Sequence, residues 1–151
     1  MISIKLSDLT PTELNLIEQA KLAAKNYFNK RSNRRVGAAL LCKDESIYQG
    51  TSIRRTNASN STCSERMALD RAIFDKKYDY STIAIVGYLN DEKLDEVTAP
   101  CGLCRQIMSE AEYNGDTNQP FTVILASPDL SNIIKTTTAE LFPMPYHGKE
   151  K

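Results

Sequence analysis

Cysteine is the residue type in this sequence with the clearest potential for chemistry. Cys101 and Cys104 form a C-x-x-C pair, and Cys63 stands upstream in a C-x-E-R motif. Each motif is expected to begin a helix, where backbone N–H groups and the positive end of the helix dipole stabilise thiolates. Three thiolate ligands on zinc leave the fourth position open for water, as a catalytic zinc requires. The spacing therefore predicts one Zn²⁺ per chain, held by these three cysteines.

A structural zinc site is the alternative, and it needs four protein ligands. The remaining candidates are Cys42 and the sole histidine, His147. Cys42 lies in an apolar run and is expected to be a buried core thiol, whereas His147 stands near the C-terminus and is expected to face solvent. Disulfides are disfavoured by the reducing compartment that we expect. The sequence therefore favours the catalytic site.

Two charged residues stand beside Cys63. Glu65, on the first turn of the helix, can point at a metal-bound water without ligating the metal, and pass a proton to a substrate nitrogen. Arg66 can donate to the sulfurs and so withdraw the excess negative charge of three thiolates on Zn²⁺. The alternatives are a surface glutamate, which a helix start favours, and a solvated arginine. We take Glu65 as the candidate catalytic residue.

Composition excludes several classes of protein. The chain has 151 residues, of which 41% are hydrophobic and 25% charged, which suits one globular domain over 1–151. Lys+Arg and Asp+Glu both number 19, and this zero net charge argues against a nucleic-acid or membrane-surface binder. No run approaches the ~18 apolar residues of a membrane span. The first residues lack a secretory signal pattern, so we expect a cytoplasmic location.

Periodicity places the motifs on an α/β fold. The capping box of Thr10 and Glu13 predicts a helix over about 11–29, and further helices are expected over 63–74, from 100 to about 113 and briefly over 138–141. Strands are expected over 36–42, 46–53, 82–89 and 121–126, with a candidate fifth over 133–138. This alternation predicts helices packed on a mixed five-stranded sheet. The tail from about 147 is expected to be loose.

The motifs carry a family resemblance. C-x-E-R at Cys63, followed by P-C-x-x-C-R-Q at Pro100, resembles the zinc-dependent cytidine deaminases of the small three-cysteine type, with blasticidin-S deaminase-like members included. Supporting matches are VGAAL at 36–40, Gly50 and LFPMPY at 141–146. The resemblance therefore spans most of the chain, from about 14 to 146.

The resemblance implies a three-layer fold and hydrolytic deamination of a cytosine nucleoside, such as cytidine or deoxycytidine, with release of ammonia. It implies that Cys63, Cys101 and Cys104 hold one zinc ion and that Glu65 transfers protons. It also implies a homotetramer whose sites borrow residues across interfaces, with Tyr146 stacking on a base in a neighbouring subunit. The expected partner is a small pyrimidine nucleoside, not a membrane or a nucleic acid.

Three positions depart from the family's pattern for holding the nucleoside. The ribose-binding Asn and Glu fall on Ser52 and Arg54, and the aromatic residue that lies against the base falls on Arg34. An arginine offers a ribose hydroxyl no acceptor, but it can pair with a carboxylate or phosphate. The alternative substrate is therefore a modified or anionic cytosine compound, blasticidin S-like or a nucleotide.

Two other interpretations remain open from the sequence. The first is that Arg34 and Arg54 simply lie in solvated loops. The second is that the protein is a non-catalytic, zinc-stabilised interaction domain with the same fold. Glu65 argues against the second, because an eroded site has no need of an acid–base residue.

Overall fold

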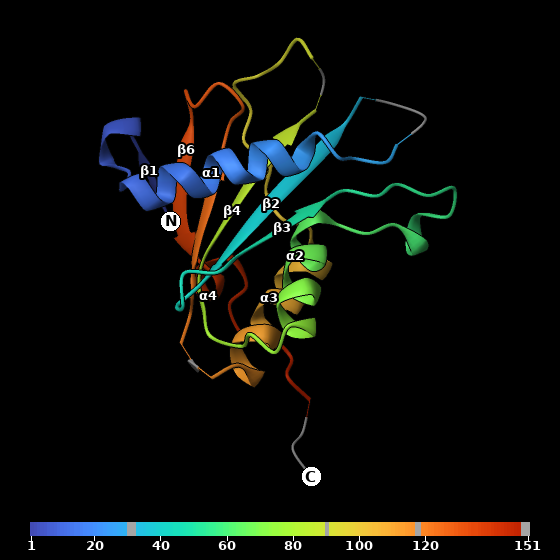
Figure 1. Ribbon diagram of the computed structural model, residues 1–151, viewed down its shortest axis with the longest axis vertical. Helices are drawn as coiled ribbons and strands as arrows, with labels where there is room; N and C mark the ends of the chain where they lie inside the picture. Colours follow the sequence, from blue (N-terminus) through green and yellow to red (C-terminus); the bar gives the residue numbers. More distant parts are fainter. Residues whose placement is uncertain (30–32, 90, 117–118, 149–151) are drawn as a thin grey trace.

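A mixed β-sheet runs through the centre of the molecule (Figure 1). The computed structural model describes residues 1–29, 33–89, 91–116 and 119–148, and over these residues the sheet has six strands in the order β1-β6-β5-β4-β2-β3. Strands β4 and β5 pair in parallel, and the other neighbours are antiparallel. The strands are β1 (Ile2–Ile4), β2 (Arg35–Cys42), β3 (Ile47–Thr51), β4 (Tyr80–Tyr88), β5 (Thr122–Ala126) and β6 (Ile133–Thr137).

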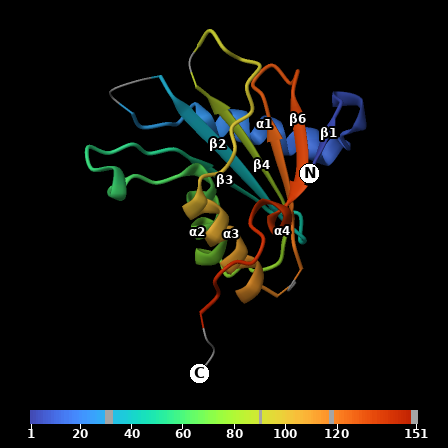
Figure 2. The same cartoon turned by 180° about the vertical axis from the view of Figure 1, so that it is seen from behind.

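Helices cover both faces of the sheet (Figures 1 and 2). Helix α1 (Pro11–Ala24) packs on one face, and α2 (Ser64–Phe74) and α3 (Gly102–Asn114) pack on the other. Alternate side chains of strand β4 contribute to the cores on the two faces of the sheet. Ile83 and Ile85 belong to the core beneath α2 and α3, and Ala84 and Val86 belong to the core beneath α1. The predicted three-layer α/β fold is confirmed. No helix in the described part of the chain is long and apolar enough to cross a bilayer.

The sheet has one strand more than the five that the sequence predicts. The candidate strand over 133–138 forms β6, and β1 pairs antiparallel with it through Ile2↔Lys135 and Ile4↔Ile133. Three residues are too few to show the alternation by which a strand is recognised, so β1 was not expected. The short α4 (Thr138–Leu141) follows β6 directly, as predicted.

Helix α1 begins as predicted but ends earlier. The Glu13 N–H donates to Thr10 Oγ1 (3.2 Å) and the Thr10 N–H donates to Glu13 Oε2 (2.9 Å), which completes the capping box. The helix ends at Ala24 rather than near residue 29, because Phe28 leaves it to pair with the segment after β3. The Phe28 N–H donates to the Ser52 carbonyl oxygen at 3.1 Å. Tertiary pairing thus overrides helical periodicity here.

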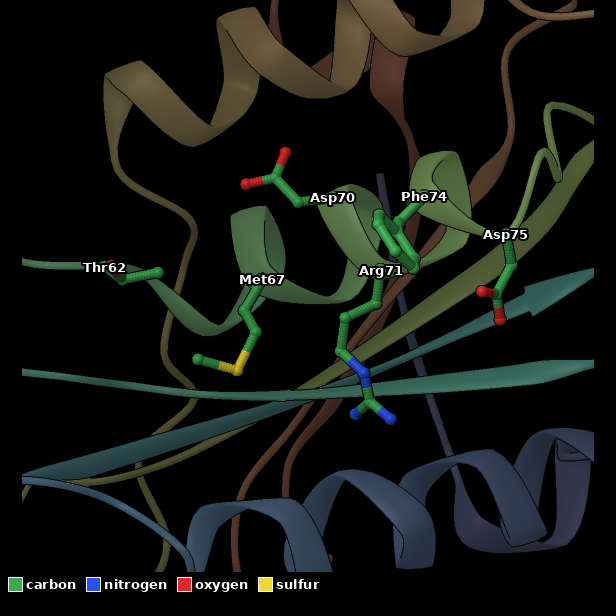
Figure 3. A pocket seen from close by; sticks show the side chains of 6 residues that line it. All are labelled: Thr62, Met67, Asp70, Arg71, Phe74 and Asp75. Atoms are coloured by element: carbon green, nitrogen blue, oxygen red, sulfur yellow. The ribbon is translucent and has the colours of Figure 1, made fainter.

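Strand β3 ends the sheet on one side, and two side chains of α2 cover its free edge (Figure 3). Arg71 Nη1 donates to the Gln49 carbonyl oxygen at 2.6 Å, and the Thr51 N–H donates to Met67 Sδ at 3.4 Å. Covering an edge in this way occupies backbone groups that would otherwise pair with another chain. It also fixes α2 to β3, close to Cys63 and Glu65 at the start of α2.

Candidate functional site

The N-termini of α2 and α3 bring three cysteine sulfurs together. Cys63 precedes the first turn of α2, Cys101 holds the same position on α3, and Cys104 lies in the first turn of α3. The Sγ atoms of Cys63 and Cys101 are 3.9 Å apart, and those of Cys101 and Cys104 are 3.5 Å apart. Tetrahedral zinc with ~2.3 Å Zn–S bonds sets its sulfurs ~3.8 Å apart. The cluster therefore fits one zinc ion.

The electrostatics of the cluster favour a thiolate. The hydrogen bond from Cys104 lowers the pKa of the Cys63 thiol to about 6, with a smaller contribution from the positive charge of Arg66. The same Cys63–Cys104 contact raises the pKa of the Cys104 thiol. A metal ion deprotonates the thiols that coordinate it. Zinc binding would therefore displace the proton of the hydrogen bond between Cys63 and Cys104.

The two other candidate ligands lie elsewhere. Cys42 is buried in β2, in the core beneath α2 and α3, as predicted. His147 is exposed, but its Nε2 is hydrogen-bonded to Ser109 Oγ at 2.8 Å and its ring packs against Tyr113, so the tail is attached to α3 at this residue. Residues 149–151 of the predicted loose tail lie outside the described residues. Among the residues that are described, the three cysteines form the sole cluster of three or more candidate ligands.

Glu65 lies beside this cluster, with only 5% of its surface exposed. Burial raises the pKa of the Glu65 carboxyl, while hydrogen bonds from its own backbone N–H, Ser64 and Cys104 act in the opposite direction. The Ser64 hydroxyl donates to Glu65 Oε2 at 2.9 Å. A carboxyl whose pKa is raised by burial suits general acid–base catalysis near neutral pH.

The place of Glu65 depends on a close approach between α2 and β3. A Cβ atom on Gly50 would lie 2.0 Å from the Ser64 carbonyl oxygen and 2.7 Å from the Ala68 nitrogen. Both atoms belong to the backbone of α2, so no change of side-chain rotamer relieves the clash. Only glycine at this position lets the first turn of α2 lie against the strand.

We therefore expect Gly50→Ala to destabilise the protein by at least about 1–3 kcal/mol, as overpacking does, and to lower its zinc content. Urea unfolding and elemental analysis measure the two effects. Gly102→Ala is the matched control, because a Cβ there meets nothing within 4 Å. Equal stability of the two variants would contradict this account.

A pocket of about 490 Å³ opens onto the cluster. Its volume lies in the range of small-molecule sites. Its walls come from the ends of β2 and β3, the loop before α2 and the segment before α3. The lining residues are Arg34, Val36, Ser52, Ile53, Arg54, Ala58, Ser61, Thr62, Cys63, Ser64, Glu65, Thr98, Ala99 and Cys101. Two of the three clustered cysteines and Glu65 thus face one cavity.

A second hollow, of about 360 Å³, runs along the outer side of α2 (Figure 3). Its lining residues are Thr62, Met67, Asp70, Arg71, Phe74 and Asp75. They include no cysteine and do not include Glu65. The pocket lined by Cys63, Cys101 and Glu65 is therefore the candidate active site.

Comparison with known protein families assigns the chain to one of them. A sequence model described as the cytidine and deoxycytidylate deaminase zinc-binding region matches residues 11–115. This span includes the three cysteines and Glu65. The chain belongs to this deaminase family. The family assignment and the sulfur cluster agree on a zinc cofactor, which confirms the prediction from the sequence.

Individual relatives of this deaminase agree with the family assignment. A cytidine deaminase of Sporosarcina psychrophila is 32% identical over 128 residues, 85% of this chain and 86% of that protein. A blasticidin-S deaminase of Bacillus cereus is 27% identical over 146 residues, 95% of this chain and 98% of that protein. The crystal structure of cytidine deaminase from Burkholderia pseudomallei has a TM-score of 0.75 at 28% identity, covering 91% of this chain and all of that one.

Arg66 differs from its expected geometry. Among the described contacts its guanidinium does not donate to a sulfur; Nη2 donates to the Ser61 carbonyl oxygen at 2.7 Å and approaches Thr62 Oγ1 at 3.4 Å. Side chains on a helix lean toward its N-terminus, which here directs Arg66 at the loop before α2. Its effect on Cys63 is therefore exerted through charge, and it also ties down the pocket wall.

The three positions that depart from the family pattern all line the pocket: Ser52, Arg54 and Arg34. Ser52 Oγ accepts the Val36 N–H at 3.0 Å and so ties the end of β3 to the start of β2. Its hydroxyl hydrogen is still able to donate to a ligand. The structure thus brings these three positions to the cavity that holds Glu65.

Tyr146 is not brought to this pocket. Its side chain is 76% exposed, and it is absent from the described lining of the cavity. Its carbonyl oxygen accepts from Gln106 Nε2 at 2.5 Å, which holds the C-terminal segment along α3. Within one chain, the described structure therefore does not place Tyr146 at the candidate active site.

Sequence reasoning missed Ser64, which is fully buried beside Glu65. Its position between Cys63 and Glu65 was the available signal, but serine at a helix start is ordinarily a capping residue. In the structure its hydroxyl instead holds one carboxylate oxygen of Glu65.

We expect Ser64→Ala to lower kcat at least about 10-fold, since a hydrogen bond to a charged group contributes about 1.5–3 kcal/mol. KM should change little, because Ser64 acts through Glu65. Steady-state kinetics at equal zinc loading measures the effect, with circular dichroism to verify the fold. An unchanged kcat would show that the hydroxyl does not position the carboxylate.

Proposed function

We propose that this protein catalyses the hydrolytic deamination of a cytosine nucleoside, replacing the C4 amine with a carbonyl oxygen and releasing ammonia. One observation carries the proposal: the buried carboxyl of Glu65 and two of the three clustered sulfurs line the same pocket. The relatives named cytidine deaminase support the same activity.

Glu65 is the residue to which the proton transfers are assigned. A zinc ion bound by the three sulfurs supplies a Lewis acid that lowers the pKa of water toward neutrality. Glu65 takes one proton from the attacking water and delivers it to N3 while the oxygen bonds to C4. It carries the second proton to the departing amine, the C4–N bond breaks and ammonia leaves. One water proton ends on N3 and the other in ammonia.

Ammonia release tests the proposal. The zinc-loaded protein is assayed with cytidine, deoxycytidine, their monophosphates and blasticidin S, and product formation is followed by absorbance. We expect turnover of at least one of these compounds. Inactivity on the whole panel, with zinc bound and the fold intact, would favour a non-catalytic, zinc-stabilised domain.

We also propose that the protein is a homotetramer in which Tyr146 stacks on a base in a neighbouring subunit's pocket. The exposure of large apolar side chains supports an interface, since Phe74 is 85% exposed and Met144 98% exposed. Light scattering measures the assembly state. A fully active monomer would contradict this proposal.

A cytoplasmic location and a role in pyrimidine salvage complete the proposal. Salvage would follow from free cytidine or deoxycytidine as the substrate. The balance of 19 basic and 19 acidic residues supports a small-molecule partner over a nucleic acid or a membrane surface. Cell fractionation and measurement of nucleoside pools after gene deletion test the two points.

A further inference from the structure

We propose that Arg34 and Arg54 form a subsite for an anionic group, carboxylate or phosphate, on the cytosine compound that this enzyme deaminates. The inference rests on the proposed function and names its substrate class. Its basis is the placement of two arginines, distant in sequence, on the lining of the pocket that Glu65, Cys63 and Cys101 also line.

The sheet register brings the two arginines together. Strands β2 and β3 pair antiparallel, and Gly37 lies opposite Thr51. Arg34 stands three residues before Gly37, and Arg54 stands three residues after Thr51, so both leave the same end of the strand pair. That end lies on the side of the molecule where α2 begins (Figure 1). The arginines thus come from strand ends, and the catalytic groups from helix starts.

The backbone that carries Arg54 is held on both sides. The Arg54 N–H donates to the Phe28 carbonyl oxygen at 2.6 Å. Its neighbour Ile53 exchanges two backbone hydrogen bonds with Thr62, each of 2.9 Å. A charged side chain on an ordered backbone loses less conformational entropy when it binds a ligand. Arg54 is therefore presented to the pocket rather than carried on a free loop.

Arg34 stands between two residues that are both tied to Asp91. Asn33 Nδ2 donates to Asp91 Oδ2 at 2.8 Å, and Arg35 Nη1 pairs with Asp91 Oδ1 at 2.9 Å. The Arg35 guanidinium also stacks over the Tyr88 ring, 4.3 Å from its centroid. Arg35 is thereby engaged away from the cavity, and Arg34 is the arginine of this pair that lines it.

The charge of the pocket favours an anion. Glu65 is the one carboxylate among the described lining residues, and it is buried and held by Ser64. Over the described part of the chain, the Arg54 guanidinium makes no ion pair. The guanidinium of arginine has only donors, and their fork matches the oxygens of a carboxylate or phosphate. It offers no acceptor to the hydrogen of a neutral sugar hydroxyl, so arginine suits a hydroxyl less well than an anion.

Matched substrates test the subsite. Values of kcat/KM are measured on the zinc-loaded protein for cytidine, cytidine 5′-monophosphate and cytidine 5′-carboxylate, which share the base and differ in the 5′ group. We expect at least one anion to exceed cytidine by 10-fold or more, chiefly through KM. The stronger of the two anions identifies phosphate or carboxylate. Cytidine equal to or better than both anions would overturn the proposal.

Variants assign the effect to the arginines. Arg54→Gln should lower kcat/KM for the preferred anion about 10- to 150-fold, the range for one charge-assisted hydrogen bond, and affect cytidine less. Arg55→Gln is the matched control, because Arg55 donates to the Asn60 carbonyl oxygen at 3.3 Å and does not line the pocket. Arg34→Gln provides a second test if Arg54→Gln folds poorly. Equal effects of Arg54→Gln and Arg55→Gln would overturn the proposal.

Measurements of product binding, which need no turnover, distinguish the anion subsite from the proposed deaminase activity. Calorimetry compares uridine with uridine 5′-monophosphate and uridine 5′-carboxylate, the corresponding products. Tighter binding of an anionic product supports the subsite even if no substrate is deaminated, whereas turnover of cytidine without any preference for anions supports the activity alone.

Discussion

Replacing Glu65 with alanine is expected to lower the deamination rate at least ~10²-fold, the low end for a general acid–base residue. The substitution removes the group to which the proposed mechanism assigns both proton transfers and leaves all three sulfurs in place. Zinc content and the circular dichroism spectrum should therefore match those of the unaltered protein. Initial rates of ammonia release at saturating substrate measure the loss.

A matched control for this variant is Glu18→Ala. Glu18 lies on the surface of α1, where it pairs with Lys21 at 3.1 Å, and α1 packs on the face of the sheet opposite α2. Its removal should leave the rate within about 2-fold, as is usual for surface substitutions. Turnover by Glu65→Ala equal to that of Glu18→Ala would remove Glu65 from the mechanism.

Replacing Cys101 with alanine is expected to weaken zinc binding by more than about 100-fold. Loss of a group that merely supports a ligand typically costs 10–100-fold in metal affinity, so loss of a thiolate ligand should exceed this. Elemental analysis after dialysis should then fall from one zinc ion per chain to a small fraction. Activity should fall in parallel, because Glu65 alone cannot activate water.

Cys42→Ser is the control for zinc loss. Cys42 is buried in the core of β2 and is separate from the sulfur cluster. The variant should keep its zinc, although its stability should fall because a buried thiol is replaced by a more polar hydroxyl. Zinc loss from Cys42→Ser equal to that from Cys101→Ala would revive the four-ligand structural site.

The two cysteine motifs were predictable as helix starts because the signal of each motif is local. A C-x-x-C pair places two sulfurs on one helical turn, and helix starts favour thiolates whatever the rest of the fold does. The capping box of Thr10 and Glu13 is equally local, and it formed as predicted. The sequence by itself therefore determined the candidate zinc ligands and the helix starts that carry them.

Tertiary structure decided what depends on pairing between distant segments. Strand β1 exists only through its pairing with β6, and α1 ends at Ala24 because Phe28 pairs beyond β3. Arg66 contacts Ser61 rather than a sulfur because of how the loop before α2 lies against the helix. None of these contacts has a signature in the spacing of nearby residues.

The part of the pocket that Arg34 and Arg54 line shows most clearly which features the sequence determines and which the fold decides. Arg34 and Arg54 stand in separate polar segments of the sequence, and each could belong to a solvated loop. The antiparallel register of β2 and β3 brings Arg34 and Arg54 to the lining of one cavity. The close approach at Gly50 packs α2, which carries Glu65, against β3. Register and close packing are properties of the folded chain, because they arise only when distant segments meet and bury their shared surface.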